Sequence, residues 1–215
     1  MNIGNSMQVC GQGAKKVGTL GGFFTFGGKD IFGISNNHVL ANFNNCQVGD
    51  KICKAGSSIV VGTLQYWVKL NNASNYLDVA LFRLSPGIDP YWNIKGSTSY
   101  PGNIREAIEG ETVYMIKNNG SVKEGKISRR FLTEEITFML SGSNYPFIGL
   151  IEIEALYDSP FSLEGESGSL IFSEEGDVLG LLVGTLVDGS KSYCIPFIHH
   201  TVGINAVYPL RVWQP

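Results

Sequence analysis

The sequence predicts an all-β protein made of two packed β-barrels, and three observations support this fold class. Glycine is abundant, with 27 among 215 residues, and it separates short runs rich in Val, Ile, Leu, Phe and Tyr. Tight turns at 27–30, 174–177 and 188–190 join several runs, and their Gly and Asp residues tolerate the positive φ that hairpins require. Helical periodicity is scarce. Short strands separated by turn residues are typical of sandwiches and barrels.

Ten runs are expected to form strands in this order: 17–26, 30–35, 58–70, 76–84, 111–117, 136–140, 145–156, 168–172, 178–186 and 191–197. A short C-terminal helix is expected over 198–208. Between the fourth and fifth runs, Pro86, Pro90 and Pro101 interrupt the strand pattern. Proline is excluded from sheet interiors, so 86–107 is predicted to connect two halves over the surface. The chain is therefore expected to be a single unit, 1–215, with barrels over 14–85 and 108–215 and a cleft between them.

Composition and charge exclude several classes of function. Sixteen basic and 19 acidic residues give a net charge of −3, without the clustered basic residues of a nucleic-acid-binding domain. No apolar run reaches the roughly 18 residues that a membrane span requires, and the first residues lack the basic and apolar regions of a secretory signal. We therefore expect neither a nucleic-acid nor a membrane partner.

Four cysteines are sparse for a disulfide framework, which favours free thiols in a reducing cytoplasm; they are Cys10, Cys46, Cys53 and Cys194. Cys46 and Cys53 have no second pair at ligand spacing, so no metal site is expected. No cofactor is expected either. The oligomeric state is left open.

Three short segments contain the candidate catalytic residues. His38 follows an apolar strand, Asp78 lies within a β-branched and aromatic run, and Ser167 lies between Gly165 and Gly168 just before a strand. Alone, each has a plain structural explanation: a structural or exposed histidine, a strand-end aspartate and a generic glycine-rich turn. Together they give the order His, Asp, Ser, with the first two in one half and the third in the other. Residues that meet in a cleft between barrels in this order suit nucleophilic catalysis by a triad.

The chain resembles the trypsin/chymotrypsin-like peptidase superfamily from about residue 17 to 209. Within it, the sequence is most similar to the narrow-leaf type of plant peptidase-like proteins and their bacterial relatives. The matching segments are Gly-Thr-Leu-Gly at 18–21, Ser-Asn-Asn-His-Val-Leu-Ala at 35–41, the Asp78 strand, Phe161 and Ser162 ahead of 165–169, and Gly-Leu-Leu-Val-Gly at 180–184. The resemblance implies two six-stranded antiparallel barrels and serine endopeptidase activity on a protein or peptide substrate.

The roles implied by the resemblance follow residue by residue. Ser167 would be the nucleophile, His38 the general base and Asp78 the residue that orients the histidine ring. The N–H groups of Gly165 and Ser167 would form the oxyanion hole. Substrate would contact the following residues: Phe161, Ser162, Val183, Gly184 and Thr185.

Glu166 and Ser169 depart from the usual Gly-Asp-Ser-Gly-Gly pattern. Nothing resembles an activation site, so Glu166 is expected to pair with a local Lys or Arg, or to face solvent. The expected pocket residues include no acidic group, which argues against a preference for Lys or Arg and favours a small or apolar side chain. The alternative function is a catalytically silent or regulatory module that uses the peptidase fold to bind a protein partner.

Overall fold

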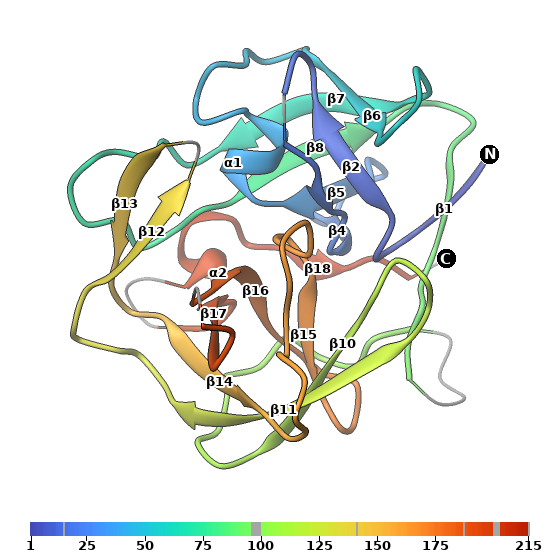
Figure 1. Ribbon diagram of the computed structural model, residues 1–215. Helices are drawn as coiled ribbons and strands as arrows, with labels where there is room; N and C mark the ends of the chain where they lie inside the picture. The colour runs from blue at the N-terminus through green and yellow to red at the C-terminus, as the bar shows by residue number, and fades with distance from the viewer. Residues whose placement is uncertain (15, 96–99, 141, 187, 200–202, 215) are drawn as a thin grey trace.

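The computed structural model describes residues 1–14, 16–95, 100–140, 142–186, 188–199 and 203–214, and their regular structure is almost entirely β. One half is an eight-stranded sheet (Figure 1). In spatial order its strands are β18 (Arg211–Val212), β4 (Gly22–Thr25), β5 (Phe32–Ser35), β8 (Ala80–Leu84), β7 (Val60–Trp67), β6 (Lys51–Lys54), β2 (Gln8–Gly11) and β3 (Gly18–Thr19).

The other half is a closed barrel of six antiparallel strands. They are β10 (Thr112–Ile116), β11 (Val122–Arg129), β14 (Ile151–Ala155), β17 (Lys191–Pro196), β16 (Val178–Thr185) and β15 (Leu170–Ser173). A hairpin of β12 (Ile136–Leu140) and β13 (Ser143–Phe147) stands apart from the barrel, and β1 (Asn2–Gly4) pairs in parallel with β9 (Asp89–Tyr91).

The expected all-β class and two-part architecture are confirmed, with one correction to the first half. It is a curled eight-stranded sheet and not a closed six-stranded barrel. Its end strand β3 and its strand β4 are consecutive in the chain, separated only by Leu20 and Gly21. At one end of the sheet β3 pairs with β2, and at the other end β4 pairs with β5 and β18. Because β3 and β4 are adjacent in the chain, the two ends of the sheet lie close together and the sheet is curled.

The first half also extends beyond the expected range 14–85. It includes β2, which precedes residue 14, and β18, which lies in the range expected for the second barrel. Two hydrogen bonds and aromatic packing explain the return of β18: the backbone N–H of Trp213 donates to the Phe23 carbonyl, and the Trp92 indole N–H donates to the Trp213 carbonyl. Both indole rings meet the Phe23 ring edge-on.

Among the residues that the structure describes, two short helices accompany the sheets. Helix α1 (Asn37–Leu40) follows β5, and helix α2 (Ile204–Val207) lies near the C-terminus. The expected C-terminal helix is confirmed but short, since Tyr208 is extended, with φ −124° and ψ 107°. Residues 200–202 of the predicted range lie outside the described residues, as do 96–99 of the predicted connection. No helix in the described part of the chain has the length and apolarity needed to cross a membrane.

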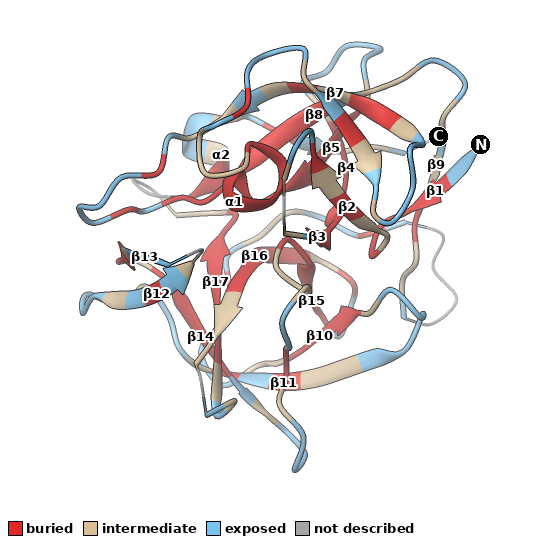
Figure 2. Ribbon diagram, turned by 45° about the horizontal axis from the view of Figure 1, so that its top comes forward, coloured by how far each residue is buried: buried red, intermediate tan, exposed pale blue. Residues whose placement is uncertain are grey.

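Each half buries its own apolar core. Figure 2 shows that the strands of both halves are buried over much of their length, whereas the connecting turns are exposed. One cluster fills the curled sheet and extends across the junction, where Leu181 and Phe172 pack with residues of the first half. A second cluster, including Ile153 and Leu182, fills the barrel. The packed junction fixes the relative position of the two halves and hence of the segments between them.

Candidate active site

His38 lies in the single turn of α1, at the end of β5. All four residues of this turn are buried, and the His38 side chain is only 4 % exposed. The preceding Asn36 donates its side-chain N–H to the backbone carbonyl of Asp78 at 2.7 Å. This bond ties the start of the turn to the chain just ahead of β8.

Asp78 is fully buried and binds His38 through both carboxylate oxygens. Its Oδ2 is 2.5 Å from Nδ1 of the imidazole, and its Oδ1 accepts the backbone N–H of His38 at 3.1 Å. An ionised carboxylate can only accept hydrogen bonds, so Nδ1 carries the proton in this pair. In the neutral ring, Nε2 is then the acceptor, and it has no hydrogen-bond partner among the described residues.

A left-handed turn places an aromatic ring beside His38. Asn42, Phe43 and Asn44 have φ values of 46°, 56° and 69°, a region that non-glycine residues seldom occupy and that asparagine tolerates best. The Asn37 side chain donates to Asn44 Oδ1 at 2.7 Å, and Asn44 Nδ2 donates to the Leu70 carbonyl at 2.8 Å.

These bonds hold the Phe43 ring between two others. Its centroid lies 5.8 Å from that of His38 and 5.6 Å from that of Tyr145 on β13. The stack joins the first half to the β12–β13 hairpin at the edge of the site. The sequence does not predict this arrangement, because its only local signal is the density of asparagine.

Ser167 lies on a tight turn that is pressed against the first half. Gly165 and Gly168 have φ values of +87° and +91°. Thr19 donates its backbone N–H to the Ser167 carbonyl at 2.7 Å and its hydroxyl to the Gly165 carbonyl at 3.0 Å. A Cβ atom at position 168 would lie 2.1 Å from Ser35 Oγ, so only glycine fits there. The roles of Thr19 and Ser35 were also missed, because both act through contacts between the halves.

The hydroxyl and the N–H groups of this turn differ in their partners. Ser167 Oγ donates to the Val183 carbonyl at 2.9 Å. The backbone N–H groups of Gly165 and Ser167 have no acceptor in the described part of the chain. Two unpaired N–H groups, two residues apart beside a hydroxyl, can receive an anionic oxygen.

Glu166 forms an ion pair with Lys117, so it has a basic partner and does not simply face solvent. The Lys117 Nζ lies 2.7 Å from Glu166 Oε1, with the two side chains 19 % and 13 % exposed. The other carboxylate oxygen accepts the backbone N–H of Leu163 at 2.8 Å. One side chain therefore anchors the turn to the end of β10 and closes it on itself.

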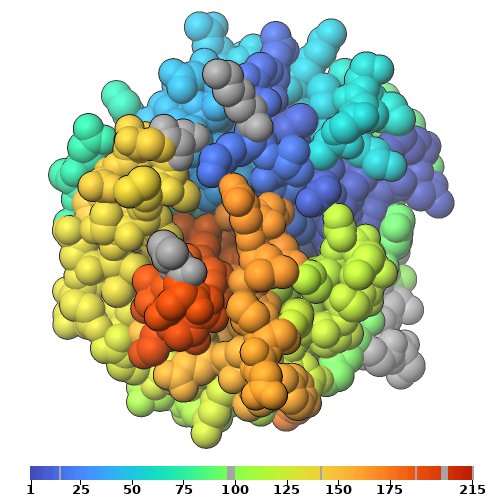
Figure 3. Space-filling model, in the orientation of Figure 1, coloured from blue at the N-terminus to red at the C-terminus, as the bar shows by residue number. Residues whose placement is uncertain are grey.

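A cleft of about 880 Å³ brings these groups together, with His38 and Ser167 both in its wall. Figure 3 shows it as a hollow between the yellow β12–β13 hairpin and the orange chain near residues 160–168. Of the residues expected to contact substrate, four line the cleft: Ser162, Val183, Gly184 and Thr185. Phe161 does not, because its side chain is 1 % exposed and packs into the barrel core. The sequence also did not identify Thr137–Leu140 of β12 as cleft residues.

A second cavity, about 730 Å³ in volume, lies elsewhere and contains neither His38 nor Ser167. Within the described ranges, no group of three or more His, Cys, Asp or Glu side chains is placed to hold a metal ion.

The fold is similar to that of solved chymotrypsin-like serine proteases. A glutamic acid-specific serine protease that uses a histidine triad in substrate binding superposes with a TM-score of 0.69 at 14 % identity, covering 98 % of this chain and 100 % of that one. Thermobifida fusca protease A gives 0.67 at 15 %, and Cellulomonas bogoriensis chymotrypsin gives 0.67 at 16 %, each covering 100 % of both chains. The chain matches no protein-family model and no curated protein sequence. At such low identity the similarity shows a chymotrypsin-like fold and assigns no residue a role.

Proposed function

We propose that this protein is a serine endopeptidase in which Ser167, His38 and Asp78 form the catalytic triad. The observation that carries the proposal is the pair of hydrogen bonds between Asp78 and His38, whose side chain lines the same cleft as Ser167. Burial of an aspartate is costly unless it is paired, and here the partner is a histidine whose other nitrogen has no hydrogen-bond partner within the described ranges. The similarity to solved serine proteases supports the proposal at the level of fold.

The proposed reaction begins with attack of Ser167 Oγ on the carbonyl carbon of the scissile peptide. His38 Nε2 accepts the hydroxyl proton, and the Asp78 carboxylate stabilises the resulting imidazolium. The unpaired N–H groups of Gly165 and Ser167 bind the oxyanion, where each donor is worth about 2.7–4 kcal/mol in comparable sites. His38 then protonates the leaving amine, an acyl-enzyme remains on Ser167, and water releases it by the same steps in reverse.

The unpaired edge of β16 suits the substrate backbone. Among the described residues, this strand has no ladder partner on the β15 side beyond Leu181, apart from two bonds that Leu182 makes with Gly168 and Ser169. Gly184 and Thr185 continue the edge along the cleft. An extended peptide can add to such an edge by main-chain hydrogen bonds, which brings its carbonyl towards Ser167.

One observation favours the second candidate, a silent or regulated module. The Ser167 hydroxyl donates to the Val183 carbonyl. Attack requires this proton to be transferred to His38 Nε2 instead. A protein in which this exchange did not occur would bind peptides along the cleft without cutting them.

Labelling with a serine-reactive fluorophosphonate tests the proposal, because the probe needs an activated serine and no knowledge of the substrate. We expect labelling of the wild type, loss of labelling in Ser167→Ala and His38→Ala, and full labelling in Ser57→Ala. Ser57 is exposed and lies outside the cleft, so it is the matched control. A folded wild type that is not labelled, or a Ser167→Ala variant that still is, would favour the binding module.

Within the fold, we propose a relation to the narrow-leaf type of plant peptidase-like proteins and their bacterial relatives. The support is the Ser-Asn-Asn-His-Val-Leu-Ala segment at 35–41.

A further inference from the structure

Three hydroxyl groups form a cluster in the wall of the cleft. Ser162 and Thr185 line the cleft, and Ser192 lies behind them. Ser162 Oγ is hydrogen-bonded to Thr185 Oγ1 and lies 2.8 Å from Ser192 Oγ, while Thr185 Oγ1 lies 3.1 Å from Ser192 Oγ. The exposed fractions of Ser162 and Ser192 are 1 % and 0 %, so the cluster is largely shielded from water.

The cleft lining beside this hydroxyl cluster is apolar and, among the described residues, includes no buried Lys, Arg, Asp or Glu. Phe138, Pro160 and Leu186 line the same cleft. Its charged lining residues among those described, apart from His38, are Lys16, Glu164 and Asp188, all at the exposed rim or half-exposed. Lys16 and Glu164 pair with each other, and Asp188 accepts bonds from Ser190.

The cluster has more acceptors than donors. Each hydroxyl has one proton and two lone pairs. Thr185 Oγ1 lies 3.2 Å from the Ser162 carbonyl oxygen and can donate its proton to it. The hydroxyl protons of the two serines can be donated to oxygens within the cluster. All three protons then have acceptors inside the protein, and lone pairs remain for an incoming donor. Rotation of one hydroxyl frees a proton for an incoming acceptor.

We propose that this hydroxyl cluster selects a substrate residue with a carboxamide side chain, glutamine or asparagine, immediately before the scissile bond. The inference rests on the proposed peptidase function and adds its substrate class. A carboxamide has two N–H donors for the free lone pairs and one carbonyl for a rotated hydroxyl.

Other side chains fit less well. An apolar residue would leave the remaining lone pairs of the hydroxyls without a donor, and sites built to hydrogen-bond a substrate group reject analogues that lack it. A carboxylate needs several donors at once, and a lysine ammonium needs a counter-charge, because burial of an unpaired ion is costly. The cluster thus changes the sequence-based expectation of a small or apolar residue.

The test uses peptides that are identical except for the residue before the cut: Gln, Asn, Glu, Met or Lys. Cleavage by the wild type is measured as kcat/KM, and binding to the uncut peptides is measured by calorimetry on Ser167→Ala. We expect Gln or Asn to exceed Met, Glu and Lys by at least about tenfold in both measurements. Ser162→Ala and Thr185→Val should reduce that preference, whereas Ser57→Ala should keep it.

The outcomes separate this inference from the proposed function. Cleavage that is fastest after Met, Glu or Lys would overturn the carboxamide preference and leave the peptidase function intact. Carboxamide-selective binding without cleavage would support the cluster's role and contradict the peptidase function. Equal binding of all five peptides would overturn the inference, as would an unchanged preference in both hydroxyl variants.

Discussion

The ion pair between Lys117 and Glu166 is expected to hold the Ser167 turn in its active shape, and Lys117→Met tests this directly. Methionine keeps the length and most of the apolar contact of lysine but removes the charge. The Glu166 carboxylate, only 13 % exposed, would lose its cation and keep the Leu163 N–H as its partner. The carboxylate would then gain by turning towards water, which would pull on the chain between Gly165 and Ser167.

Two limits bracket the stability cost. Exposed ion pairs contribute about 0–1 kcal/mol, whereas removing one partner of a buried pair costs about 3–5 kcal/mol. With side chains 19 % and 13 % exposed, the pair lies between these limits, and we expect about 2 kcal/mol. Displacing one N–H of the proposed oxyanion hole would lower kcat by a factor of about 10²–10³.

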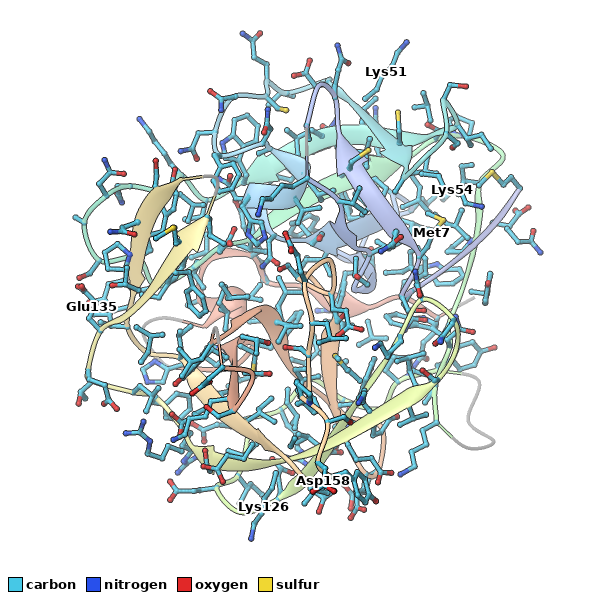
Figure 4. The ribbon with its side chains drawn as sticks, in the orientation of Figure 1. Met7, Lys51, Lys54, Lys126, Glu135 and Asp158 are labelled. Carbon is cyan, nitrogen blue, oxygen red and sulfur yellow. The ribbon has the colours of Figure 1, made fainter. Side chains whose placement is uncertain are left out.

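The assay combines thermal unfolding with steady-state kinetics. Lys126→Met is the control, because Lys126 is an exposed lysine of the same barrel that projects from its outer surface (Figure 4). It should leave both stability and kcat unchanged, while Lys117→Arg should restore most of the activity lost in Lys117→Met. The kinetic loss should fall on kcat more than on KM, since the oxyanion forms only in the transition state. A Lys117→Met variant with kcat within twofold of the wild type would refute the reasoning.

Two further predictions concern acid stability and the thiols. Burial alone would raise the pKa of Glu152, but hydrogen bonds from Arg129, Lys191, Ser128 and Tyr193 outweigh it and lower the pKa to about 2, against 4.5 unfolded. A carboxyl group with a lowered pKa stabilises the fold above pH 4.5, and this stabilisation is lost as the pH falls towards 2. Denaturant unfolding should therefore show that the free energy of unfolding decreases by about 3 kcal/mol over this range. Glu152→Gln should lose much of this pH dependence, and an unchanged profile would count against the network. All four cysteines are free, and Cys46 and Cys194 are buried. Ellman's reagent should therefore react with two thiols in the native protein and four in denaturant, whereas two complete disulfides would contradict the predicted cytoplasmic location.

Local sequence signals were sufficient to single out the candidate residues that the structure brings together at the cleft. His38, Asp78 and Ser167 each lie in a short segment of distinctive composition, and Gly165 and Gly168 mark a turn with positive φ. Strand existence was equally local, since it follows from apolar runs between turn residues. The all-β class could therefore be predicted from the composition of the apolar runs and from the turn residues between them.

What the sequence did not predict depends on contacts between distant segments. Thr19 bonds to the turn at Gly165, 146 residues further along the chain, and nothing near Thr19 indicates this. Phe161 precedes the Ser167 turn closely in the sequence, but its side chain packs into the barrel core and not into the cleft. Pairing of β18 with β4 likewise depends on Trp92 and Phe23, which receive Trp213 only once the first half has folded.

That last pairing has a consequence for synthesis of the chain on the ribosome. The outer edge of β4 lies early in the sequence, but its partner, Arg211–Val212, is translated after every other strand that the structure describes. Until then the first sheet has an unpaired edge, and an uncovered edge strand is a template for pairing with other chains. The half made first is thus the half completed last, and a nascent chain stalled before residue 211 is the species most in need of a chaperone.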